Sequence, residues 1–267
     1  MTVPALEGVG VHGGRRAVVR LYRVDGPVRF RSGRHELAPD WRRVVATRGA
    51  TTLGDDGVRI GTVEHLLAAL HVRGVFAGLL IEVIGDELPI LDGSAAPWDA
   101  ALAELGPFPP PPPAFDRTAT VAAGDRYARH APGTRGLEVS VAYDDPRIGA
   151  QRWTGGPERW ADLLPARTFG FARDADALRA AGLALGSSER NAIVYHDDAP
   201  PPSLRFPDEP VRHKALDALG DLYLLGVPFA GRVEVRRGGH DLHLALVRSL
   251  AGPVRAADPE AATERRA

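Results

Sequence analysis

One short stretch of the sequence spaces a histidine and two aspartates four residues apart. In RHKALDALGD, residues 212–221, these are His213, Asp217 and Asp221. On a helix this spacing places all three side chains along one stripe. The apolar residues of the segment fall on the opposite side, so the stripe is either the solvated face of an amphipathic helix or a ligand set that faces a cleft. The scarcity of Lys and Glu on the stripe favours the cleft.

A second candidate lies far earlier in the chain, where Glu64 and His65 adjoin each other. In the ordinary alternative, Glu64 complements a helix dipole and His65 lies on the surface. In the functional alternative, His65 joins His213 and Asp217 as the third ligand of a metal ion. Two histidines and one carboxylate leave a fourth position for water, as in catalytic zinc sites. Glu64, beside a ligand, would then take a proton from that water as a general base.

A third candidate is His240 in RGGHDLH, residues 237–243. Its ordinary explanation is an incidental histidine in a loop that begins a helix. The paired glycines before it, however, let backbone and substrate approach closely. An imidazolium here could protonate a leaving amine, and Asp221 could hydrogen-bond the ring and keep it cationic.

Composition limits the chemistry that is available. The 267 residues include no cysteine, so disulfides, thiolate catalysis and sulfur ligands are excluded, and any metal must be held by His, Asp or Glu. Lys and Arg number 33 against 34 Asp and Glu, and this net charge of −1 gives no global attraction for nucleic acid or anionic membranes. The sequence shows neither an apolar run of transmembrane length nor a signal peptide. We therefore expect a cytoplasmic protein.

A proline-rich segment divides the chain. In GPFPPPPPAF, residues 106–115, five consecutive prolines favour a stiff polyproline II conformation and exclude a helix interior. We interpret residues 107–115 as a linker between an N-terminal domain, residues 1–106, and a C-terminal domain, residues 116–267. Each part begins with strand patterns and continues with helix patterns, so the expected fold class is α+β.

Residue periodicity places the candidates on elements. In GTVEHLLAALHVRG, residues 61–74, apolar residues recur at helical spacing, with Thr62 as the predicted N-cap and Gly74 as the C-cap. A second helix is expected over residues 211–225, where it carries the stripe, and a last one begins at 241. The other expected elements are strands at 16–24, 26–32, 78–85, 118–123, 137–143, 191–198 and 231–237, and helices at 158–164 and 174–181. A further helix is expected in LDGSAAPWDAALAEL, residues 91–105, after a turn at Asp92 and Gly93.

Seven segments follow one another in a single order along nearly the whole chain. They are GVGVHGG, VRIGTVEHLLAAL, IGDELPILDGSAAP, ARTFGF, GLALGSS, EPVRHKALDALGDLYLLG and RGGHDLH. Together they resemble the zinc-dependent UDP-3-O-acyl-N-acetylglucosamine deacetylases of lipid A biosynthesis. The resemblance implies two similar domains, each a layered sandwich of a β-sheet and helices, with the active site in the cleft between them. It also implies hydrolysis of the N-acetyl group of the UDP-linked sugar, with release of acetate.

The resemblance assigns roles to the candidates one by one. It implies one Zn²⁺ per chain, or Fe²⁺ in the cell, held by His65, His213 and Asp217. Glu64 matches the general base of the family. His240 matches the catalytic acid, and Asp221 matches the carboxylate that is paired with that acid.

Further roles come from the resemblance alone. Thr168 in ARTFGF matches a hydroxyl that supports the oxyanion, and Phe169 lines the substrate site. Lys214 matches a lysine that contacts substrate at the mouth of the site, and His12 corresponds to a histidine at the nucleotide end. The sequence departs from the family pattern at Ser187, Asp241 and His243.

Two competing hypotheses stay open. One is a metal amidase that acts on another N-acetylated sugar or a peptide. The other is a non-catalytic relative that binds a nucleotide sugar, which predicts the loss of at least one catalytic or ligand residue. All five of these are present, namely Glu64, His65, His213, Asp217 and His240. The expected partner is the UDP-linked acylated glucosamine, without nucleic acid or a transmembrane segment, and the expected state is a monomer.

Overall fold

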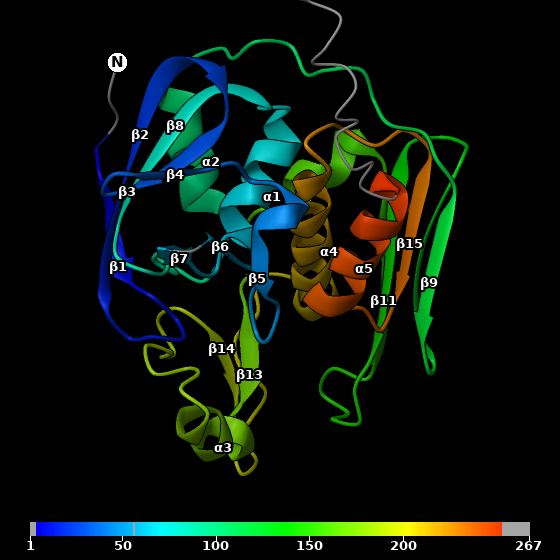
Figure 1. The fold of residues 1–267 in the computed structure, drawn as a ribbon. Helices are drawn as coiled ribbons and strands as arrows, with labels where there is room; N and C mark the ends of the chain where they lie inside the picture. Colours follow the sequence, from blue (N-terminus) through cyan, green and yellow to red (C-terminus); the bar gives the residue numbers. More distant parts are fainter. Residues whose placement is uncertain (1–3, 56, 253–267) are drawn as a thin grey trace, which may run out of the picture.

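The computed structural model describes residues 4–55 and 57–252 and arranges them in layers (Figure 1). Two five-stranded sheets form the outer layers, and helices fill the space between them. In β2, alternate residues such as Val19 and Leu21 are fully buried, as expected of a strand with one face on the core. The first sheet has the order β1-β2-β8-β3-β4, formed by β1 (Leu6–Val9), β2 (Arg16–Pro27), β3 (Arg29–Ser32), β4 (His35–Leu37) and β8 (Ala77–Ile84).

The second sheet repeats the topology of the first. When only the five strands of each sheet are numbered in chain order, both sheets have the strand order 1-2-5-3-4. The fifth strand runs parallel to the third in both sheets, and the other neighbours are antiparallel. The second sheet is formed by β9 (Ala119–Ala123), β10 (Arg126–Ala131), β11 (Gly136–Ala142), β12 (Ala150–Gly155) and β15 (Arg232–Arg236).

Each half also places one longer helix before and one after the fifth strand of its sheet, and the second half has the short helix α3 (Ala175–Ala180) in addition. In the first half these are α1 (Glu64–Arg73) and α2 (Ala96–Glu104), and in the second half α4 (Glu209–Leu222) and α5 (His240–Ala251). α1 packs against α4 at the centre of the molecule (Figure 1). Apolar side chains of both halves therefore form one continuous core.

Smaller elements are inserted between the fourth strand of each sheet and the longer helix that follows it, which is α1 in the first half and α4 in the second. In the second half, β13, β14 and α3 extend away from the layers (Figure 1). The first insertion contains β5 (Val44–Ala46), β6 (Thr52–Asp55), β7 (Val58–Ile60) and a 3₁₀ helix (Trp41–Arg43). The second contains β13 (Phe169–Phe171), α3 (Ala175–Ala180), β14 (Ile193–Tyr195) and 3₁₀ helices (Pro157–Leu163 and Ala172–Asp174), and a further 3₁₀ turn (Tyr223–Leu225) extends α4.

The expected α+β class is confirmed, and eight strands are additional to the expected ones, among them β10 and β12 of the second sheet. β10 and β12 have the sequences RYARHA and AQRWTG. Neither contains a run of β-branched residues, so the sequence alone predicts no strand there. The helix expected at 158–164 is a 3₁₀ helix.

The start of α1 corrects one expectation. Thr62 is not its N-cap, because the helix begins after Val63 and no side chain caps it. Thr62 instead has a φ of 55°, a left-handed conformation that is rare for a β-branched residue, and its hydroxyl donates to Glu87 Oε1 (2.7 Å). The hydroxyl is therefore engaged by a distant carboxylate rather than by an amide of the helix. Gly74 is the C-cap as predicted, with a φ of 69°.

The proline-rich segment contains no helix along residues 106–115. It crosses from one half to the other over the top of the molecule in Figure 1. The division into domains 1–106 and 116–267 stays a prediction, and residues 253–267 lie outside the described residues. Within the described residues, every helix is too short or too polar to cross a membrane.

A close crossing fixes α1 on α4. A Cβ on Gly220 would lie 2.1 Å from the carbonyl oxygen of Glu64, so only glycine allows the two backbones to meet there. Two turns along α1, Nδ1 of His71 donates to the carbonyl oxygen of Leu219 (2.8 Å). Burial lowers the pKa of His71 to about 4, so the ring is neutral at this bond. The hydroxyl of Tyr223, at the C-terminal end of α4, donates to the carbonyl oxygen of Val75, just after α1 (2.6 Å). This bond joins the C-terminal ends of the two helices.

We predict that Gly220→Ala lowers the free energy of unfolding by about 3 kcal/mol or more, because the added methyl group must push the helices apart. Urea unfolding followed by circular dichroism measures this loss. Gly136→Ala is the matched control, since its new Cβ would meet nothing closer than 3.5 Å. Equal stability of Gly220→Ala and the control would show that the crossing tolerates a side chain.

Candidate active site

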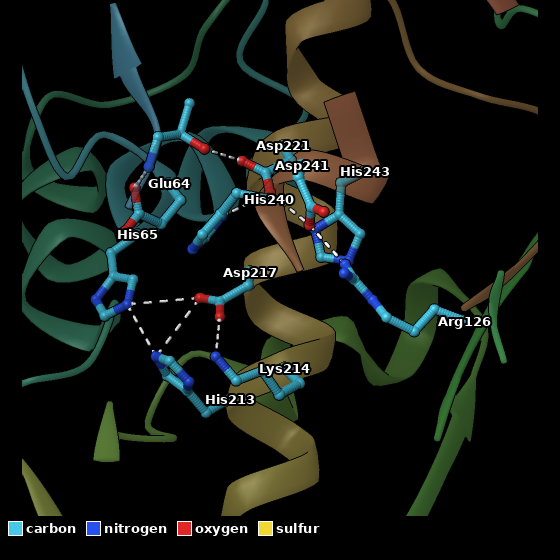
Figure 2. Close-up of polar contacts among 11 residues, drawn as sticks. Glu64, His65, Arg126, His213, Lys214, Asp217, Asp221, His240, Asp241 and His243 are labelled. Atoms are coloured by element: carbon cyan, nitrogen blue, oxygen red, sulfur yellow. Dashed lines mark hydrogen bonds and ion pairs between the residues drawn. The ribbon is translucent and has the colours of Figure 1, made fainter. Parts of the chain in front are cut away.

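Three side chains from the crossing helices converge on one point (Figure 2). His65 lies in the first turn of α1, and His213 and Asp217 lie one turn apart on α4. The Nε2 atoms of the two histidines are 3.1 Å apart. Asp217 Oδ1 lies 3.8 Å from Nε2 of His65 and 3.5 Å from Nε2 of His213. The structure thus brings together the three residues that the sequence predicts as metal ligands.

The chemistry of this triangle fits a divalent metal. All three residues are at most 4% exposed, and burial lowers the pKa of both imidazoles, which keeps them neutral. Burial would raise the pKa of Asp217, but the imidazole of His213 and the ammonium group of Lys214 hold it well below its usual range. Neutral imidazole and ionised carboxylate are the forms that bind metals.

The spacing of the donors fits as well. Donors about 2.1 Å from a tetrahedral zinc ion lie about 3.4 Å from one another, close to the three separations observed. Asp217 Oδ1 has no hydrogen-bond partner among the described residues, whereas its Oδ2 accepts from Lys214 Nζ (3.0 Å). A buried carboxylate oxygen without a donor is expected where a cation belongs.

Glu64 adjoins the triangle from the start of α1. Its Oε2 accepts a hydrogen bond from the backbone N–H of Thr51 (3.0 Å), and the side chain is buried. Burial is the largest cause of a pKa raised to about 7. A carboxylate with this pKa can accept a proton near neutral pH and release it again.

A second polar cluster centres on Asp221 (Figure 2). Its Oδ2 accepts from Nδ1 of both His240 and His243, each at 2.8 Å, and its Oδ1 accepts from the hydroxyl of Thr51 (2.6 Å). Burial alone would lower the pKa of His240, but the Asp221 carboxylate overrides it and raises that pKa to about 10. The ring is therefore an imidazolium at neutral pH. It can donate a proton from Nε2 while Asp221 keeps hold of Nδ1.

These residues surround one cavity of about 570 Å³. Nine of the ten predicted site residues line it, and the tenth, Asp221, contacts the lining residue His240 from behind. Apolar side chains from the second insertion, among them Leu178 and Val194, form part of the wall. The lining members of the predicted set are His12, Glu64, His65, Thr168, Phe169, His213, Lys214, Asp217 and His240.

The residues that the resemblance assigns to substrate lie around the triangle of His65, His213 and Asp217. Phe169 packs edge-on against the ring of His213, with 5.9 Å between centroids. Lys214 Nζ lies 5.4 Å from the centre of the Phe169 ring. Thr168 precedes Phe169 at the start of β13, and His12 enters the cavity from the loop between β1 and β2.

Comparison with known proteins identifies the family. Residues 2–252 match the sequence profile described as UDP-3-O-acyl N-acetylglycosamine deacetylase. The chain belongs to this family. It is 41% identical over 263 residues to the UDP-3-O-acyl-N-acetylglucosamine deacetylase of Brucella ovis, covering 92% of this chain and 91% of the relative, and 40% identical to that of Brucella melitensis biotype 2 over the same shares. The resemblance inferred from the seven segments is thereby confirmed.

The three departures from the deacetylase pattern have different surroundings. Ser187 lines the cavity. Asp241 pairs with Arg126 near the surface (2.6 Å). His243 is the one that reaches the polar cluster, through its bond to Asp221. Its spacing of three residues from His240 on α5 places both rings on one helix face, which is a signal that the sequence contains.

Two other residues, Thr51 and Glu87, bond to the site or to the segment just before α1, and no local spacing in the sequence indicates either of them. Thr51 bonds both Glu64 and Asp221, although it belongs to neither helix. Glu87 follows β8 and bonds Thr62, just before α1. Both contacts depend on the tertiary fold, so no local spacing predicts them.

We predict that the His240 imidazolium of the metal-free protein titrates with a pKa near 10 and that Asp221→Asn moves this pKa down towards or below 6.5. The negative charge that favours the imidazolium is lost, whereas the burial that disfavours it remains. Histidine NMR titration measures the shift, and His240→Gln assigns the resonance. An unchanged pKa in Asp221→Asn would show that another group maintains the charge.

Proposed function

We propose that this chain is a metal-dependent deacetylase that removes the N-acetyl group of UDP-3-O-acyl-N-acetylglucosamine and releases acetate, an early step of lipid A synthesis. The observation that carries the proposal is the buried donor triangle with Glu64 and His240 beside it, all on one cavity, in a member of this deacetylase family. An amide hydrolase needs a base, an acid and a means to polarise the carbonyl, and these groups provide all three.

The metal is the first part of the proposal. His65, His213 and Asp217 would hold one Zn²⁺ per chain, with Fe²⁺ as the alternative in the cell. Three protein donors of nitrogen and oxygen are typical of catalytic zinc, and they leave room for substrate. When bound, the metal polarises the amide carbonyl and lowers the pKa of a water molecule.

The chain's own groups would move the protons. Glu64 accepts a proton from the attacking water at its carboxylate, and the hydroxyl of Thr168 supports the negative charge that develops on the carbonyl oxygen. His240 donates its Nε2 proton to the nitrogen as the C–N bond breaks, so that the products leave as acetate and a free amine. Asp221 does not touch substrate; it holds the ring of His240 and keeps it cationic.

Substrate recognition would use the rest of the cavity. Phe169, Leu178 and Val194 form an apolar surface suited to the acyl chain. Lys214, whose pKa lies above its usual value beside Asp217 despite burial, keeps its positive charge at the mouth of the site. His12 would contact the nucleotide end.

The remaining expectations are part of the same proposal. The protein would act as a monomer in the cytoplasm, with the UDP-linked sugar as its partner and without nucleic acid. A net charge of −1 supports the absence of a nucleic-acid partner. Residues 1–106 and 116–267 would be its two domains.

We predict that His65→Ala and Asp217→Ala lose bound metal and activity together, because two protein donors retain zinc far more weakly than three. Metal analysis of the purified proteins by mass spectrometry measures the loss. Glu64→Gln is the matched control, since it is equally buried but is not a ligand and should retain one metal per chain. Full metal content in Asp217→Ala would disprove the ligand assignment.

We predict that the metal-loaded protein releases acetate from UDP-3-O-acyl-N-acetylglucosamine and that Glu64→Gln lowers kcat by about 10²- to 10⁴-fold, the usual contribution of a general base. Mass spectrometry of the product amine measures turnover. Activity on an unrelated N-acetylated sugar or peptide, without activity on the UDP-sugar, would favour the metal amidase. Binding of the UDP-sugar without turnover would favour the non-catalytic relative.

A further inference from the structure

The glycine-rich loop GVGVHGG, residues 8–14, encloses a carboxylate of the protein itself. Glu87 is 8% exposed, and its Oε1 and Oε2 accept from the backbone N–H groups of His12 (2.9 Å) and Gly13 (2.7 Å). A Cβ on Gly10 would lie 2.1 Å from Oε2, so the loop closes around the carboxylate only with glycine there. The backbone amides of His12 and Gly13 are therefore occupied by an anion of the protein itself.

Glu87 is itself rigidly placed. Residues on either side of it pair with Gly61, whose N–H donates to the carbonyl of Asp86 (2.9 Å) and whose carbonyl accepts from Leu88 (3.0 Å). Its Oε1 also accepts from the hydroxyl of Thr62, the residue in left-handed conformation two positions before Glu64. One carboxylate thus joins the loop to the segment that leads into α1.

The same loop positions His12 in the cavity. Its carbonyl accepts from the N–H of Leu185 (3.0 Å), and its ring Nδ1 accepts from the N–H of Ala184 (3.3 Å). Accepting at Nδ1 places the ring proton on Nε2, which leaves His12 as a donor. The backbone N–H of His12 is bound by Glu87, so two hydrogen bonds hold the backbone of this residue and a third orients its ring.

We propose that Glu87 is a positioning residue that holds the loop 8–14 and, through it, sets the ring of His12 for the nucleotide end of the substrate. The bonds to the loop stand on the geometry alone, whereas the effect on the nucleotide rests on the proposed function. A buried carboxylate that accepts two backbone amides and one hydroxyl and has no cationic partner among the described residues is suited to fix a loop.

Glu87→Gln tests the loop. The new amide nitrogen cannot accept a hydrogen bond, so in either orientation one loop N–H, that of His12 or that of Gly13, loses its acceptor. We expect hydrogen exchange of the His12 and Gly13 amides to accelerate about tenfold or more. Asp86→Asn is the matched control, because this neighbouring carboxylate is half exposed and pairs with Arg15 at the surface. Unchanged exchange in Glu87→Gln overturns the proposal.

The link to His12 is tested with UDP as the probe on the metal-loaded protein. Glu87→Gln and His12→Ala should each raise the calorimetric Kd for UDP about tenfold, and the double variant should bind no more weakly than His12→Ala. If the two substitutions weakened UDP binding additively in the double variant, Glu87 would not act through His12. A general structural defect caused by Glu87→Gln would add to the effect of His12→Ala in this way. If the wild-type protein bound no UDP, the proposed substrate would fail, and the exchange experiment would still decide the role of Glu87.

Thr62→Val covers the case in which Glu87→Gln does not fold. This variant removes only the hydroxyl and leaves both loop amides with their acceptors. Exchange of the same amides should accelerate about threefold, because Glu87 loses one of its three bonds. Exchange equal to that of the wild type would overturn the proposal that Glu87 holds the loop. Melting temperatures of all variants verify that the proteins compared are folded.

Discussion

The close approach of α1 to α4 is the constraint on which the site depends. Donors from two helices that are far apart in the chain can form a triangle with edges of 3.1 to 3.8 Å only if the helix axes are fixed to a fraction of that distance. Gly220 allows this close approach, because without a Cβ it lets the carbonyl oxygen of Glu64 pack directly against the backbone of α4. The buried bond from His71 to Leu219 then prevents the helices from sliding. The contact that packs α1 against α4 therefore also positions the side chains of the proposed active site.

The repeated topology explains why the ligands come from these helices. α1 and α4 are equivalent, since each precedes the fifth strand of a sheet with the order 1-2-5-3-4. Two copies of one unit, packed helix to helix, bring equivalent faces together at the centre. The copies have diverged in what they contribute there: one proposed ligand and the proposed base come from α1, whereas two proposed ligands and Asp221 come from α4. The insertions differ more, and the second one supplies β13, β14 and α3, whose side chains line the cavity.

Local spacing accounts for part of this site and tertiary contact for the rest. The separation of four residues between His213 and Asp217 puts both on one helix face, so their pairing is readable from the sequence. Nothing in the spacing joins them to His65, so the residue types offered it as a third ligand only as one of two alternatives, and the family resemblance decided between them. The N-cap prediction at Thr62 failed because this residue has a left-handed backbone conformation and the helix begins only after Val63. The hydroxyl of Thr62 instead donates to Glu87, a contact across the fold that cannot be inferred from the helix sequence itself. β10 and β12 were missed for a similar reason, since their strand conformation depends on neighbours in the sheet.

Three buried carboxylates lie within this small region, and their partners decide which one can act as a base. Asp217 faces two imidazoles and an ammonium group, and Asp221 accepts three hydrogen bonds, two of them from histidines. Both are thereby held in the charged form, with pKa values below the usual range. Glu64 accepts a hydrogen bond from only one backbone N–H. Burial therefore raises its pKa, and the negative charges of Asp217 and Asp221 raise it further. The different numbers of donors thus suit the three carboxylates to the three proposed roles of metal ligand, partner for His240 and proton acceptor.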